Sequence, residues 1–251
     1  MVNPVDPRIA TLRPSVGRGA AATYDEGLRS YMLSIYNYMA SGVLLTGIVA
    51  LLVASNEALL SAFFAVNARG GVSPTILGWI AMISPLAIIL VMNFGMNRLS
   101  ESTLKATFFG FAAVMGVSMS VIFLRYTGAS IAQTFFISAA TYGALSLWGY
   151  TTKRDLSAMG RFLIMGLFGI LIAMIANIFI QSSSLQLAVN ILGVLIFAGL
   201  TAYDTQRLRE LYYDVQGSAI VGKVAILGAL TMYLNFINLF QFLLQFLGDR
   251  R

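Results

Sequence analysis

Seven long apolar runs recur along this chain, and they limit what it can fold into. Runs of about 20 residues with almost no charged side chain are long enough to cross the hydrocarbon core of a bilayer as α-helices. Only 10% of the residues are charged, whereas about a quarter are charged in soluble domains. The sequence therefore predicts an all-α integral membrane protein with seven transmembrane helices, at residues 32–54, 75–95, 104–124, 130–150, 162–180, 185–205 and 223–247.

Residues 1–30 precede the first run and differ from it in composition. They contain Pro, Gly and four arginines, and no apolar core of the kind that a signal peptide needs. We expect this segment to be a disordered cytoplasmic tail. We expect residues 31–248 to form the seven-helix transmembrane domain.

The distribution of Lys and Arg predicts the orientation. Short connections force consecutive spans to run antiparallel, so the N-terminal tail shares one side of the membrane with every second loop. Twelve Lys and Arg residues fall on that side, and four fall on the other: Arg69, Arg125, Arg250 and Arg251. Basic residues are enriched in cytoplasmic loops, so we expect a cytoplasmic N-terminus and an external C-terminus. The alternative is a last segment that re-enters the membrane without crossing it, because the charged C-terminal end GDRR fits the outer side less well.

The composition excludes several classes of function. The chain has no Cys and no His, so thiolate zinc sites, Cys or His nucleophiles and histidine pH sensors are absent. Rhomboid-like and aspartyl intramembrane proteases need a His or a second intramembrane Asp, and neither is present. The basic residues are scattered among loops, which does not indicate nucleic-acid binding. We expect a protein that is not an enzyme and needs no cofactor.

One acidic residue has an unusual position. Among ten Asp and Glu residues, Asp204 alone falls within or at the edge of an apolar run. A charge at the membrane centre costs about 2.5–3.5 kcal/mol, so such residues usually face the protein interior and have a function. The alternative is a boundary position, in which Asp204 ends the span 185–205 and pairs with Arg207 three residues later.

The last run offers polar partners for Asp204. The segment ALTMYLNFINLFQFLLQFLG (229–248) contains Asn235 and Asn238 among apolar residues. An amide in lipid favours a partner on another helix, and a helix that is apolar nearly all round suits a central position. We therefore expect these amides to meet Asp204 in the interior.

Two of these segments resemble a known family. AYDTQRLR (202–209, which includes Tyr203) and YLNFINLF (233–240) are similar to motifs of the Bax inhibitor-1 family of membrane proteins, and residues 120–160 resemble its bacterial members. The resemblance covers about residues 25–248. It implies seven helices, with two three-helix layers around a central C-terminal helix, in a bacterial inner membrane.

The resemblance also implies a function. Members of this family are associated with a pH-dependent calcium leak, and others with suppression of cell death or with restraining a membrane-bound protease. In the leak mechanism, two aspartates on spans six and seven share a proton, and an arginine after span two pairs with the first aspartate. Carried over to this sequence, the first aspartate is Asp204, the arginine is Arg98, and the second aspartate falls at Asn235.

Asn235 departs from the family pattern YLDFINLF. Two adjacent carboxylates cannot both ionise cheaply and share a proton, whereas a single Asp204 stays ionised to lower pH. The site also has one negative charge less for calcium, so Asp204 is at most a calcium contact and no firm metal site is predicted. We predict a cation (calcium) leak channel with altered pH sensing. The alternative is a non-conducting regulator that binds other membrane proteins, such as a membrane-bound protease.

Overall fold

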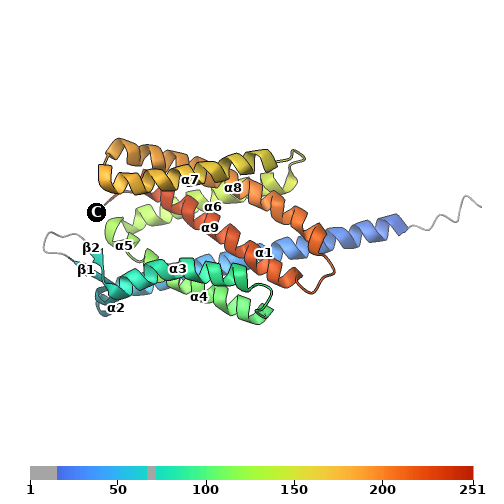
Figure 1. Ribbon diagram of the computed structural model, residues 1–251, viewed down its shortest axis with the longest axis horizontal. Helices are drawn as coiled ribbons and strands as arrows, with labels where there is room; N and C mark the ends of the chain where they lie inside the picture. Colours follow the sequence, from blue (N-terminus) through green and yellow to red (C-terminus); the bar gives the residue numbers. More distant parts are fainter. Residues whose placement is uncertain (1–15, 67–71, 251) are drawn as a thin grey trace, which may run out of the picture.

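The computed structural model describes residues 16–66 and 72–250, with the backbone alone for residues 16–25. Long helices lie side by side in one bundle (Figure 1). This confirms the predicted all-α membrane protein. In chain order the elements are α1 (Val16–Ser55), α2 (Glu57–Phe63), β1 (Phe64–Val66), β2 (Val72–Pro74), α3 (Ile76–Gly95), α4 (Glu101–Met119), α5 (Ile122–Arg125), α6 (Gly128–Thr151), α7 (Ser157–Ile180), α8 (Ser183–Val215) and α9 (Val221–Leu247). The two strands form a small antiparallel hairpin in which Phe64 is paired with Pro74.

Hydroxyl side chains cap the start of four long helices. At the N-termini of α3, α4, α6 and α8, the capping oxygen accepts a hydrogen bond from the backbone N–H three residues later. Such caps matter near lipid, because few other acceptors are available there for the first N–H groups of a helix. The capping residues are Thr75, Ser100, Thr127 and Ser182.

Six helical segments in the described part of the chain are long and apolar enough to cross a membrane. The predicted run 130–150 is not among them. Its helix α6 has 24 residues, but its buried face consists largely of hydroxyl residues spaced four apart. This face packs against α8 and α9. Its hydroxyl residues are Ser130, Thr134, Ser138, Tyr142 and Ser146.

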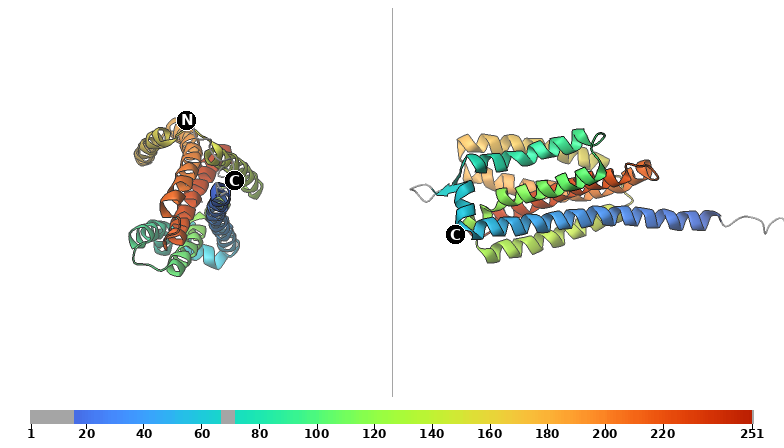
Figure 2. Two further views of the ribbon diagram at one scale, coloured as in Figure 1. Left: turned by 90° about the vertical axis from the view of Figure 1, so that its right-hand side faces the viewer. Right: turned by 90° about the horizontal axis from the view of Figure 1, so that it is seen from below.

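Helix α9 is the most buried of the long helices. It contacts α1, α4, α6 and α8, and Figures 1 and 2 show it between them. It is continuous over 27 residues, so the helix has no re-entrant break. In contrast, α7 packs on α8, and only Gly160 and Ile170 are buried among its residues.

Helix α1 begins earlier than predicted. It starts at Val16, so residues 16–30 are helical where the sequence analysis expects disorder; residues 1–15 lie outside the described part. A helix that is already nucleated in a membrane span extends at low cost, and the alanines at 20–22 favour extension. From Leu28 onward the helix also packs against the bundle, where the Tyr31 ring lies 5.2 Å from that of Tyr212 on α8.

The basic loops gather at one end of the bundle. Figure 1 places the start of α1 and the α3–α4, α6–α7 and α8–α9 connections at the right. There the Lys223 ammonium donates a hydrogen bond to the Met96 carbonyl at 3.2 Å. At the opposite end, the backbone of Arg250 pairs with that of Tyr126. For the described residues, the two groups of basic residues predicted from the sequence therefore lie at the two ends of the molecule.

Candidate functional site

Asp204 lies inside α8 and not at its end. The helix continues to Val215, beyond the predicted limit at residue 205. It continues because Leu208 and Tyr212 follow at helical spacing and are buried. Between them, Glu210 is exposed, and the half-buried Arg209 donates a hydrogen bond to the Tyr150 carbonyl on α6. Asp204 itself is only 7% exposed. Asp204 is therefore a buried residue within its helix and not the last residue of it.

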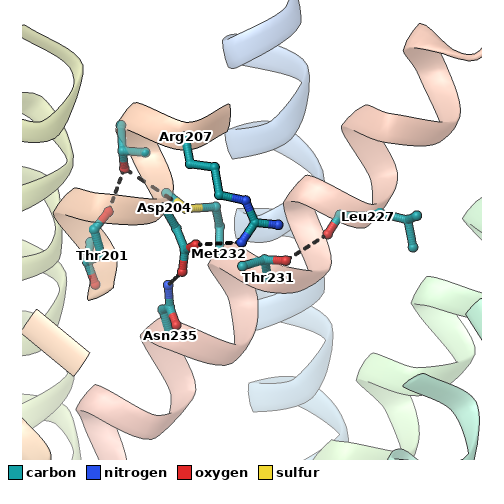
Figure 3. A network of polar contacts seen from close by, with 8 residues as sticks. Thr201, Asp204, Arg207, Leu227, Thr231, Met232 and Asn235 are labelled. Carbon is teal, nitrogen blue, oxygen red and sulfur yellow. Dashed lines mark hydrogen bonds and ion pairs between the residues drawn. The ribbon is translucent and has the colours of Figure 1, made fainter. Parts of the chain in front are cut away.

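Two side chains bind the Asp204 carboxylate (Figure 3). The Asn235 amide Nδ2 on α9 donates a hydrogen bond to Oδ2 at 2.8 Å. The Arg207 guanidinium Nη1, one turn along α8, donates to Oδ1 at 3.4 Å. The Arg207 side chain is 55% exposed, so the pair reaches from the interior toward the surface. The sequence offers an ion pair with Arg207 and a contact with Asn235 on another helix as alternatives for Asp204. Both occur together in the structure.

Close helix contacts hold the residues directly before Asp204. A Cβ atom on Gly149 of α6 would overlap the backbone oxygen of Ala202. A Cβ atom on Gly160 of α7 would overlap the ring of Tyr203. Glycine at both positions therefore lets α6 and α7 approach α8 closely. Tyr203 packs against α7.

Sequence reasoning missed Gln206, which also holds this part of α8. The side chain is buried, and its Oε1 accepts a hydrogen bond from the Leu156 N–H at 2.8 Å. Its Nε2 donates to the Arg154 carbonyl, also at 2.8 Å. The amide thereby ties the α6–α7 connection to α8. The available signal was an amide two residues after Asp204, on a helix that was predicted to end there.

Buried hydroxyl groups of α6 and α8 lie near the acid–amide pair. The Thr205 hydroxyl donates to the Thr201 carbonyl at 2.8 Å and lies 3.5 Å from the Ser146 hydroxyl on α6. The Tyr142 hydroxyl donates to the Met232 carbonyl on α9 at 3.0 Å. The site is thus continuous with the hydroxyl face of α6.

Sequence comparison identifies relatives of this chain. A family model described as "Inhibitor of apoptosis-promoting Bax1" matches residues 28–251. The chain belongs to the Bax inhibitor-1 family. It is 42% identical to the inner membrane protein YbhL of Escherichia coli K12 over 227 residues, which cover 90% of this chain and 94% of that protein. It is 44% identical to a protein of Rickettsia prowazekii over 229 residues, or 91% of this chain and 93% of the relative.

A membrane protein of Streptococcus pyogenes is a more distant relative in the Bax inhibitor-1 family. It is 32% identical over 226 residues, which cover 89% of this chain and 94% of that protein. The family resemblance seen in the two motifs is therefore confirmed, and it extends over nearly the whole chain.

Arg98, which we expect from the resemblance to be the partner of Asp204, forms no salt bridge with it in this structure. Arg98 is exposed in the turn after α3, where its backbone N–H binds the Gly95 carbonyl. Among the described residues, the salt bridge of Asp204 is with Arg207 alone. Asn238 also lies apart from the acid, because its Nδ2 donates to the Leu234 carbonyl of its own helix at 2.8 Å. The site therefore consists of Asp204, Asn235 and Arg207.

A cavity approaches this site from the end where α1 begins. It has a volume of about 750 Å³ and lies between α1 and α6. Its wall includes Glu26, Arg29, Tyr36 and Ser146. Because Ser146 also contacts Thr205, the wall of the cavity reaches the residue next to Asp204. Within the described part of the chain, no three acidic side chains come together that could hold a metal ion.

Proposed function

We propose that this protein is a cation leak channel of the bacterial inner membrane, with calcium as a transported ion and Asp204 as the central acidic group. The observation that carries the proposal is the buried carboxylate that joins α8 to the central helix α9 through Asn235. A buried carboxylate is expensive in a membrane protein and usually marks an ion or proton pathway. The function needs no enzymatic step and no cofactor.

The surroundings of Asp204 support a pathway of this kind. The cavity of about 750 Å³ leads from the end with the basic loops toward Ser146. The hydroxyl face of α6 runs from Ser146 to Ser130 at the opposite end. Hydroxyl and carbonyl oxygens can replace part of the hydration shell of a cation. Ser146 and Thr205, between the cavity and Asp204, are buried and in contact, so this conformation would be the closed state of the proposed channel.

The pH response of this channel would differ from that of a channel with two acids. Asn235 stands where the family pattern has an aspartate, so the site has one acid and an amide that donates to it. A single carboxylate held by an arginine and an amide has no proton to share with a second acid. We therefore propose a weak pH dependence, and Arg207 takes the role of the counter-ion that the family pattern gives to Arg98.

The proposed arrangement in the membrane has seven spans, with α6 as the fourth. Helices α1, α3 and α4 would form one layer and α6, α7 and α8 the other, with α9 between them. The end with the basic loops would face the cytoplasm, in keeping with the excess of Lys and Arg there. The inner-membrane location follows the name of the relative YbhL.

A second candidate function is that of a non-conducting regulator that binds other membrane proteins, such as a membrane-bound protease. The observation that favours it is the exposure of α7, on which Phe162, Phe168 and Phe179 are each more than 60% exposed. A helix with so little contact to its own bundle is available to neighbouring proteins as well as to lipid.

Calcium flux in liposomes separates the two candidates. The purified protein is reconstituted with a trapped calcium dye, and calcium is added outside at two pH values. A channel gives a flux above that of protein-free liposomes, whereas a regulator gives none at either pH. An Arg207→Gln variant sharpens the test, because removal of the counter-ion from a channel should change the rate.

A further inference from the structure

A second large cavity lies at the end of the bundle opposite the basic loops. Its volume is about 1030 Å³, and it is enclosed by α3, α4, α5, α8, α9 and the C-terminal residues. Apolar side chains such as Met82 and Leu244 form much of its wall. Its main polar groups are Arg125, Tyr126, Gln186, Gln241, Gln245 and Arg250.

The two charged side chains of the described residues that line this outer cavity are both cationic. They are the guanidinium groups of Arg125 and Arg250, and no Asp or Glu of the described ranges lines the cavity. Neither arginine forms a salt bridge with any residue in the described ranges. Cationic groups in a concave and partly apolar surface concentrate anions, because the low-dielectric wall screens the charge poorly.

Backbone pairing brings the two arginines to the same place. Tyr126, directly after Arg125, forms a backbone bridge with Arg250. The Thr127 N–H donates to the Asp249 carbonyl at 3.2 Å, and the Asp249 N–H donates to the Ser130 hydroxyl at 2.9 Å. The C-terminal segment is thus fixed against the start of α6, and the two arginines on either side of this contact line the same cavity.

The amides of the cavity add hydrogen-bond donors. Gln186 accepts from the Asn177 amide at 3.2 Å and donates to Asn190 at 2.9 Å and to Gln245 Oε1 at 3.3 Å. In this series of amides the Gln245 oxygen accepts from Gln186, so the Gln245 NH₂ group can donate to another partner. Together with the two guanidinium groups, this NH₂ group offers N–H donors to a ligand made of oxygen acceptors.

We propose that the outer cavity binds an anionic group, a carboxylate or a phosphate, held by Arg125 and Arg250 with help from the Gln241 and Gln245 amides. Arginine binds both groups through paired N–H donors. The group could be carried by a free small molecule or by a lipid headgroup, which share this chemistry. The site is separate from Asp204, and the proposal does not depend on ion conduction.

Thermal unfolding of the full chain in phosphatidylcholine nanodiscs tests the proposal. Inorganic phosphate and citrate are compared with sodium chloride at equal ionic strength, and a second set of nanodiscs contains phosphatidylglycerol. We expect at least one of these anions to raise the unfolding temperature of the wild type. A response to phosphate or citrate identifies a free anion as the ligand, and a response to phosphatidylglycerol alone identifies a lipid headgroup.

Charge-matched variants decide whether the outer cavity is responsible. The double variant R125Q/R250Q should bind at least about tenfold more weakly for each arginine removed, and its unfolding temperature should no longer respond. The control K153Q/R161Q removes two charges at the opposite end and should respond as the wild type does. Q241L leaves the charge unchanged, and its unfolding temperature should rise less with the anion than that of the wild type. This variant provides the test if the arginine variants do not fold. Equal responses in wild type, R125Q/R250Q and Q241L, or no response of the wild type to any probe, would overturn the proposal.

Discussion

The Asn235 amide on α9 donates a 2.8 Å hydrogen bond to the Asp204 carboxylate on α8. This hydrogen bond joins the two residues across the interface between α8 and α9, which is the most extensive helix interface of the bundle. An amide at this position satisfies the carboxylate, whereas an acid would compete with it for a proton. The consequences can be measured from either partner.

Asn235→Asp should create a steep pH dependence of calcium flux. Two carboxylates at hydrogen-bond distance cannot both ionise cheaply, so they should share a proton near neutral pH, in a window of roughly pH 6 to 8. Lowering the pH then supplies this proton, weakens the hold on Arg207 and increases flux. Raising the pH removes it and reduces flux. The measurement is dye-reported flux in liposomes after pH steps.

Asn238→Asp is the matched control for this change, because Asn238 is on the same helix but bonds to its own backbone. It should leave the pH profile close to that of the wild type, which we expect to be flatter. A wild type that is already steep, and that Asn235→Asp does not alter, would show that proton sensing resides elsewhere.

Asp204→Asn should affect both flux and stability far more than Asp214→Asn. The first change removes a buried charge that two side chains bind, and loss of such hydrogen bonds costs about 1–3 kcal/mol. Asp214 is exposed near the end of the same helix, where substitutions usually change stability by less than about 0.5 kcal/mol. Flux and thermal unfolding of both variants give the comparison. Small and equal effects would remove Asp204 from the mechanism.

Gln206→Ala should destabilise the protein by about 1–3 kcal/mol, because it leaves the Leu156 N–H and the Arg154 carbonyl without their partner. Gln133→Ala is the control, since Gln133 is exposed on α6 and should tolerate the change. Unfolding in detergent micelles measures both. If the two variants unfold alike, the tie between the α6–α7 connection and α8 contributes nothing to stability.

Gly149→Ala should destabilise the contact between α6 and α8 by about 1–3 kcal/mol, because the new methyl group would overlap the Ala202 backbone. Gly110→Ala places a methyl group in open space on a helix, and there alanine should be neutral or stabilising by up to about 1 kcal/mol. Thermal unfolding compares the pair. If Gly149→Ala leaves the stability unchanged, α6 and α8 can move apart without a loss of stability.

A topology reporter should read cytoplasmic ahead of Thr23 and external after Arg251. The expectation rests on the excess of Lys and Arg at the N-terminal end and on seven spans. Compartment-specific reporter activity at each position is the measurement. Activity of both fusions in the same compartment would contradict the seven-span count, and an exchange of the two compartments would reverse the orientation.

The sequence predicted the positions of the long helices well, because length and hydropathy determine which segments suit a bilayer. The ends of α1 and α8 were harder to predict. Both continue past the apolar run as amphipathic helices, where Tyr31 and Tyr212 pack on each other. Contacts between helices also explain the low hydropathy of α6, because its buried hydroxyl residues pack against other helices.

The candidate site was predictable in part for a related reason. Asp204 and Asn235 stand out because polar groups in apolar runs need partners, and the structure pairs them. Arg98 could not be placed from the sequence, because it lies in a turn whose conformation depends on contacts such as that between Lys223 and Met96. Gln206 could not be assigned either, because both of its partners are backbone groups on a distant connection.

The central position of α9 has a consequence for biosynthesis. The helix that fills the middle of the bundle follows the other long helices in the chain, so the ribosome makes its neighbours first. Until α9 enters, Asp204 lacks Asn235, and Thr46 on α1 lacks the Tyr233 hydroxyl that lies 2.6 Å from it. The earlier helices therefore enter the bilayer before these two contacts with α9 can form. Because α9 contacts α1, α4, α6 and α8, its arrival completes the bundle late, and we expect chains that end before residue 221 to be more sensitive to proteases than the full chain.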